Sequence, residues 1–180
     1  ETESSVDPFR NFRTNVTQYL QDLYRFFKLS PYKKEFEDLF TGKLDIYNSE
    51  VFRLTCNAPE AEAGLADYFF SKNYYSDALE LFLKQLNTRP DESQLYEKIA
   101  FCYQNTDNYE DALRFYQRAE LIERKVWTLK KIGLCLRRLG RKEEALEYYL
   151  EAGAMDPGNI HTAIMTGHCY LDLNDYESAL

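Results

Sequence analysis

Glycine and proline, the residues that most often interrupt regular structure, are scarce in this sequence. Only 7 glycines and 5 prolines occur among 180 residues, whereas 44% of the residues are hydrophobic and 29% are charged. This composition excludes collagen-like and low-complexity disordered chains and favours a globular, helical protein. No apolar run approaches the roughly 18 residues that a membrane span needs, so we expect no membrane span.

Positive charge is also in short supply. The chain has 22 lysines and arginines against 30 acidic residues, which gives a formal net charge of −8. Such a chain repels phosphate groups overall, so nucleic acids and anionic membranes are poor candidates for partners.

The sequence also lacks the residue constellations that carry chemistry. No nucleophile stands beside a base, and no phosphate-binding loop occurs. The two histidines, His161 and His168, are seven residues apart, whereas zinc ligands on one helix would be three or four apart. We therefore expect a protein that is not an enzyme, with no cofactor and no metal.

What the sequence does contain is a pattern that returns about every 34 residues. The dipeptide Ala-Leu occurs at 78–79, 112–113, 145–146 and 179–180. Twelve residues before each of these alanines stands another small residue, namely Ala66, Ala100, Gly133 and Gly167. Self-similarity at this period is typical of repeat proteins built from small supersecondary units.

Residues 126–159 show most clearly what one unit contains. A helix is predicted over about 128–139, because apolar residues recur there at helical intervals: Leu129, Ile132, Leu136 and Leu139. Gly140 can adopt the positive φ that ends a helix. A second helix would carry Ala145 and Tyr149. Gly133 and Ala145 are then expected to be the contact points of two antiparallel helices, because small residues let backbones approach closely.

Two further positions recur in phase with the repeat. One is a turn position, whose residues tolerate a positive φ well: Asn73, Asp107 and Asn174. The other lies two residues after the small residue of each first helix and holds Cys102, Cys135 and Cys169. Cysteine behaves as a small buried hydrophobe at such a position. Free buried thiols suit a reducing compartment, so we expect a cytoplasmic protein.

This pattern closely resembles the tetratricopeptide repeat, a helix–turn–helix unit of 34 residues. The resemblance spans residues 59–180 and implies an all-α solenoid. Its units are 59–92, 93–125, 126–159 and a truncated fourth unit, 160–180. The first unit departs from the family pattern, since Gln85 stands where a small residue is usual. Because the fourth unit stops early in its second helix, we expect the native chain to continue.

Residues 1–58 do not follow the repeat. Asp7 and Pro8 suit the start of a helix, and aromatic residues are common after them. We predict an irregular helical N-terminal cap over the end of the first repeat, because solenoids need such caps. The alternatives are a dimer surface, which would make a homo-oligomer, and a segment folded into the groove.

In this family the first helices of successive repeats line a concave groove that holds a peptide or a helix. The resemblance places nine residues of this sequence in that groove: Glu97, Phe101, Trp127, Lys130, Leu134, Arg137, Arg138, Ile164 and His168. Residues 126–142 contain six basic residues and no acidic one. We therefore predict a protein or peptide partner with acidic groups and a large apolar anchor. The alternative is that these lysines and arginines only keep an exposed helix in solution.

Two classes of function follow. The favoured one is a non-enzymatic protein–protein interaction scaffold that binds a segment of a partner in the groove. The other is an assembly or regulatory segment of a longer protein, which self-associates or packs against another domain of its own chain. Some family members clamp the carboxylate tails of chaperones with lysine and asparagine side chains. Here those positions hold Ala63, Asp67, Phe101 and Leu134, and only Lys130 fits, so this ligand is not expected.

Overall fold

The computed structural model describes residues 14–15, 18, 22 and 59–179. The predicted N-terminal cap therefore lies almost wholly outside the described residues, and its boundary before residue 59 stays a prediction. Residues 59–179 contain seven α-helices and no strand, which confirms the all-α helix–turn–helix architecture. The chain divides into two units, Glu1–Leu81 and Phe82–Leu180.

In the first unit, two helices follow each other across a tight turn. Helix α3 is Pro59–Ser71, and helix α4, Tyr75–Leu86, begins in this unit and ends in the second. Asn73 in the turn has a φ of 64°, and the ring of Tyr74 packs edge-on against Phe69 with centroids 6.2 Å apart. The apolar side chains buried in this unit are Leu65, Ala66, Phe69, Ala78 and Leu81, and the carboxylate residue Asp77 is buried beside them in sequence.

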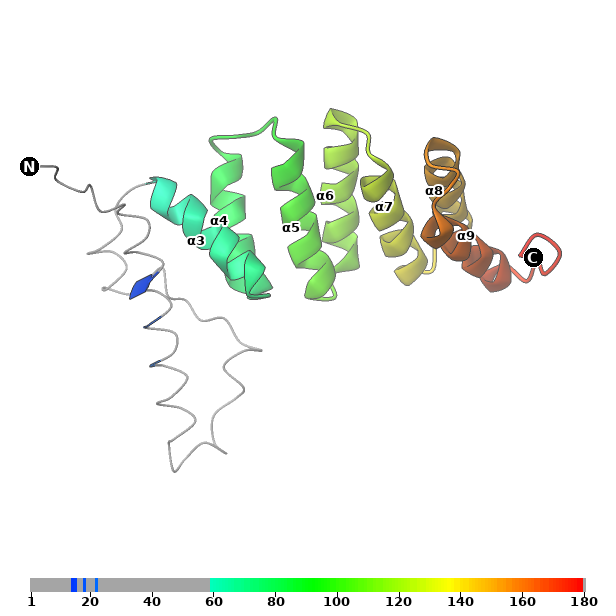
Figure 1. The fold of residues 1–180 in the computed structure, drawn as a ribbon, viewed down its shortest axis with the longest axis horizontal. Helices are drawn as coiled ribbons and strands as arrows, with labels where there is room; N and C mark the ends of the chain where they lie inside the picture. Colours follow the sequence, from blue (N-terminus) through cyan, green and yellow to red (C-terminus); the bar gives the residue numbers. More distant parts are fainter. Residues whose placement is uncertain (1–13, 16–17, 19–21, 23–58, 180) are drawn as a thin grey trace, which may run out of the picture. The chain divides into compact units, whose positions relative to one another are not determined.

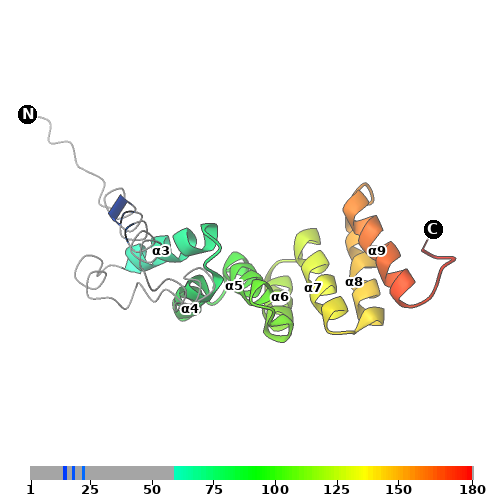
Figure 2. The ribbon, with the colours of Figure 1, turned by 90° about the horizontal axis from the view of Figure 1, so that it is seen from below.

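The second unit is a row of helices that pack in chain order (Figures 1 and 2). They are α5 (Ser93–Asn105), α6 (Tyr109–Ile122), α7 (Val126–Arg138), α8 (Lys142–Met155) and α9 (Ile160–Asp172). Each of them contacts the next. Helices α5, α7 and α9 are thus the first helices of successive repeats, and α6 and α8 are the second helices of their repeats.

The turns that follow α5, α7 and α9 have the same construction. Asp107, Gly140 and Asn174 have φ values of 58°, 79° and 63°. In each turn the following backbone N–H donates to a carbonyl five residues earlier, for example Arg141 to Leu136 at 2.9 Å. This bond satisfies a carbonyl that the end of the helix leaves without a partner. The predicted turn positions are confirmed.

Small residues allow close packing between α7 and α8. A Cβ atom added at Gly133 would lie 2.9 Å from the ring of Tyr149, and its three nearest neighbours would all be atoms of that ring. Ala145 is buried in the same core cluster. Gly133 therefore makes room for an aromatic ring of α8.

The three cysteines of the repeated position are free and fully buried: Cys102, Cys135 and Cys169. Burial raises the pKa of the Cys102 and Cys135 thiols to about 12 and also raises that of Cys169. The prediction of a shared buried position is confirmed. After α9, residues 173–179 form turns, and no further helix occurs among the described residues.

Candidate functional site

Polar contacts join α5 to α7 at the start of the face that the sequence predicts to bind a partner. The Thr128 hydroxyl donates to a carboxylate oxygen of Glu97 at 2.7 Å, and the Lys125 ammonium lies 3.3 Å from the same oxygen. Glu97, one of the nine predicted site residues, is thus engaged within the fold. Its carboxylate has a hydroxyl and an ammonium as partners before any ligand arrives.

An aromatic and cationic cluster lies next along the face. The Lys131 ammonium is 4.9 Å from the ring centroid of Phe101 and 5.4 Å from that of Trp127. Trp127 also packs edge-on against Tyr116, with centroids 5.8 Å apart, while 40% of its surface stays exposed. Burial lowers the pKa of Lys131, and the neighbouring charge of Lys130 lowers it further. The structure thus brings two predicted residues, Phe101 and Trp127, together around a lysine.

Lys131 was missed in the sequence prediction. Its one sequence signal is the spacing of four residues from Trp127, which puts the two side chains on the same helix face. That spacing does not reveal the second ring, because Phe101 belongs to another helix. The Lys131 ammonium is attracted to the faces of both aromatic rings, and this attraction holds the three side chains together in a partly exposed cluster.

An ion pair joins α7 to α9 at the other end of the face. The Arg137 guanidinium donates to the Asp172 carboxylate at 2.5 Å, and the Lys142 ammonium donates to the backbone carbonyl of Asp172 at 2.8 Å. The hydrogen bond between Arg137 and Asp172 raises the pKa of Arg137 and lowers that of Asp172. The charge of Arg137 is therefore largely compensated within the fold.

The remaining predicted residues differ in what they offer to a partner. Lys130 and Leu134 are half-buried on α7, and Lys130 forms no ion pair with any residue of 63–179. Arg138 lies over the ring of Tyr109, 5.9 Å from its centroid. On α9, Ile164 is 50% exposed and His168 is exposed one turn later.

The basic character of residues 126–142 is weaker in the folded chain than in the sequence. Two of the six cations pair with carboxylates, Arg137 with Asp172 and Arg141 with Glu144. Lys142 is held by a carbonyl oxygen. Three cations have no carboxylate partner among the described residues: Lys130, Lys131 and Arg138. The face therefore combines a few uncompensated cations with large apolar side chains.

Within residues 59–179, no three or more histidine, cysteine, aspartate and glutamate side chains converge as a metal site would require. None of the helices that the structure describes has the length and apolar character of a membrane span.

Comparison with family models identifies two repeats. Models described as tetratricopeptide repeat match residues 93–125 and 127–159. These ranges correspond to α5–α6 and α7–α8, the two helix pairs that form most of the face described above. The phase predicted from the alanine positions agrees with both matches.

Three proteins with similar sequence or structure are between 17% and 25% identical to this chain. Protein CTR9 homolog of Arabidopsis thaliana is 25% identical over 144 residues, which are 79% of this chain and only 13% of that protein. Among solved structures, MamA has a TM-score of 0.65 and 21% identity and covers 78% of this chain and 82% of its own. The first TPR domain of Spaghetti (RPAP3), bound to the HSP90 peptide SRMEEVD, has a TM-score of 0.60 and 17% identity, with coverages of 64% and 93%.

Proposed function

We propose that this chain, whose residues 93–125 and 127–159 match models of the tetratricopeptide repeat, is a non-enzymatic scaffold whose α5–α7–α9 face binds a segment of a partner protein. The observation that carries this proposal is the surface of α7. There Trp127 is 40% exposed, and Lys130 carries a charge that no described residue compensates. Tryptophan is enriched among the residues that contribute most to binding energy at protein interfaces, and exposed cations attract a partner of opposite charge.

The character of the partner follows from these side chains. An apolar anchor would contact Trp127, Leu134 and the exposed Ile164, and an acidic group would approach Lys130. The domain of Spaghetti (RPAP3) is bound to a peptide that ends in acidic residues. In this chain the clamp positions hold Ala63, Asp67, Phe101 and Leu134, so we propose a different acidic segment with a large apolar side chain.

The experiment is a comparison of folded variants in a pull-down from the lysate of the native host. Leu134→Ala should weaken capture at any salt concentration, because it removes apolar contact. Lys130→Glu should weaken capture most at low salt, because charge attraction is screened by ions. Arg137 is a poor choice for this test, since changing it would break the ion pair with Asp172.

A matched control and a contrary outcome complete the design. Glu147 is exposed on α8, away from the first helices, so Glu147→Ala should capture the same partners as the unchanged chain. Circular dichroism checks that each variant is folded. If every folded variant retrieves the same proteins, the face is only a solvated surface and the proposal is wrong. Light scattering of the purified chain tests self-association, the alternative role.

Two further properties belong to the same proposal. The partner is a protein and not a nucleic acid, because the net charge of −8 opposes binding to phosphate backbones. The site of action is the cytoplasm, because three free buried thiols suit a reducing compartment.

A further inference from the structure

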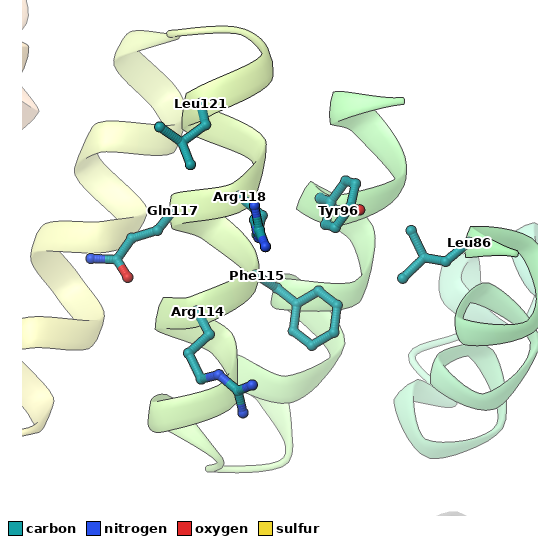
Figure 3. A pocket seen from close by; sticks show the side chains of 7 residues that line it. All are labelled: Leu86, Tyr96, Arg114, Phe115, Gln117, Arg118 and Leu121. Carbon is teal, nitrogen blue, oxygen red and sulfur yellow. The ribbon is translucent and has the colours of Figure 1, made fainter. Parts of the chain in front are cut away.

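A hollow of about 520 Å³ lies beside α6, in the second unit. Helix α6 contributes most of its lining, and α4 and α5 each contribute one side chain (Figure 3). The lining residues are Leu86, Tyr96, Arg114, Phe115, Gln117, Arg118 and Leu121. None of them belongs to the nine residues predicted from the repeat. The hollow is therefore a separate candidate site, and its volume lies within the range of ligand pockets.

The sequence suggests why space remains at this place. In the second and third repeats, the position near the end of the second helix holds Ala119 and Ala152, both fully buried. In the first repeat the same position holds Gln85, whose Nε2 atom is buried without a hydrogen-bond partner among the described residues. Because glutamine is longer than alanine, we infer that the last turn of α4 packs less closely here than the corresponding turns of the other repeats. Leu86, which follows it, forms one wall of the hollow.

The floor of the hollow is apolar and held in place. Phe115 stacks on Tyr103 with centroids 5.4 Å apart, and Tyr96 lies against Phe115 at 6.1 Å. Leu121 at the rim is 78% exposed. A ring fixed by two neighbours loses little conformational freedom when a ligand packs on it, which favours binding.

The rim beside this floor is cationic. Arg114 and Arg118 lie on successive turns of α6, on the side of the helix that carries Phe115 (Figure 3). Arg114 pairs with Asp111 at 2.9 Å, whereas Arg118 forms no ion pair with any residue of 63–179. Two exposed arginines beside an apolar hollow, in a chain of net charge −8, favour an anionic occupant.

We propose that this hollow binds an acidic segment of a partner protein. An aromatic or leucine side chain of the segment packs on Phe115 between Leu86 and Leu121, and a carboxylate accepts hydrogen bonds from Arg118. Arginine suits this role because its planar guanidinium can bind a carboxylate through two parallel hydrogen bonds. The site lies on a second helix, so it does not depend on the proposed role of the α5–α7–α9 face.

The test uses the 180-residue chain labelled with ¹⁵N and the peptide acetyl-Glu-Glu-Phe-Glu-Glu-amide. Amide shifts are followed by NMR at low salt as the peptide is added. We expect saturable shifts at Tyr96 and residues 114–121, with a Kd at or below about 1 mM, as suits so small a ligand. Arg118→Gln and Leu121→Ala should each weaken binding about fivefold or more. Both side chains are exposed, so neither change should unfold the protein.

Two controls and three contrary outcomes make the result decisive. The peptide acetyl-Lys-Lys-Phe-Lys-Lys-amide should not bind, and Glu147→Ala on α8, an exposed position outside both proposed sites, should leave the Kd unchanged. Shifts confined to α7 and α9 would mean that the acidic peptide prefers the other face and that the hollow is not its site. The proposal is equally overturned by shifts that do not saturate, or by a Kd that neither Arg118→Gln nor Leu121→Ala alters.

Discussion

Two threonines at the same position of successive repeats should respond in opposite ways to the same substitution. Thr128 and Thr162 are each the third residue of their unit, 34 positions apart, and both are buried. The Thr128 hydroxyl donates to Glu97 at 2.7 Å. The Thr162 hydroxyl has no hydrogen-bond partner among the described residues. The residue that corresponds to Glu97 one repeat later is Lys130, which cannot accept a hydrogen bond.

Replacement by valine keeps the shape of threonine and removes only the hydroxyl. Thr128→Val should lower the free energy of unfolding by about 1.5 kcal/mol, because it removes the hydrogen bond to Glu97. This value is at the lower end of the range for hydrogen bonds to charged groups, because Glu97 keeps Lys125 as a partner. Thr162→Val should raise it by about 1 kcal/mol, because a buried hydroxyl without a partner costs about that much. For a chain of this size each kcal/mol moves Tm by roughly 2–4 °C, so the two variants should differ by about 5–10 °C.

Thermal and urea unfolding, followed by far-ultraviolet circular dichroism, measure both effects. Repeat proteins can unfold in parts, so the fluorescence of Trp127, the one tryptophan of the chain, gives a second reading from α7. The reasoning fails if both substitutions shift the midpoint in the same direction, or if Thr162→Val is less stable than the unchanged chain.

The same comparison explains what Lys130→Glu should do. A carboxylate at position 130 would give the Thr162 hydroxyl an acceptor, as Glu97 does for Thr128, so stability should be equal or higher. Binding of an acidic partner to the α5–α7–α9 face should become weaker. A variant that folds at least as well but binds less would show that Lys130 contributes to binding and not to the fold.

Three more predictions concern the core. Gly133→Ala should destabilise the chain by about 1–3 kcal/mol, because the added methyl group would overpack against Tyr149. Gly153→Ala should be neutral or stabilise the chain by up to about 1 kcal/mol, because the nearest atom to the added Cβ would lie 3.8 Å away. Urea midpoints that fall equally for both variants would contradict this. Cys56, the one cysteine of the sequence outside the repeats, is first replaced by serine. A thiol reagent at neutral pH should then label Cys102, Cys135 and Cys169 only after unfolding. Fast labelling of these three in the native chain would rule out their buried state. Burial raises the pKa of Cys102 and Cys135 from about 9 to about 12, so between these pH values the thiols ionise in the unfolded chain and stay neutral in the folded one. The contribution of these thiols to the free energy of unfolding should therefore be constant below about pH 9 and should fall as the pH rises toward 12. Urea midpoints across this pH range would measure the decline.

Much of the repeat could be predicted from the sequence because its determinants are local. Positive φ at Asp107 and Gly140 depends on a few neighbouring residues, and helical spacing of apolar residues marks each buried face. The period of the small residues set the phase of the units, which agrees with the family matches at 93–125 and 127–159. The buried position of the three cysteines followed from that phase together with the resemblance to the repeat family, which usually has a small buried residue there.

The character of the candidate sites depended on contacts between residues about 30 or more positions apart. The sequence shows Arg137 as one of six cations, but Asp172 on α9 compensates its charge. Lys131 gained its importance only when α5 brought Phe101 beside Trp127.

The sequence by itself determined which segments are helices, where they turn and which face of each is buried, because these properties arise from backbone conformation and from the spacing of apolar residues. Only the tertiary structure decided which charges stay uncompensated and where a hollow remains. Gln85 was recognisable in the sequence as a residue out of pattern, but the space lined by Leu86 and Phe115 became visible only in the packed helices. Such features depend on how side chains from different helices fill a shared volume, and no local pattern encodes that volume.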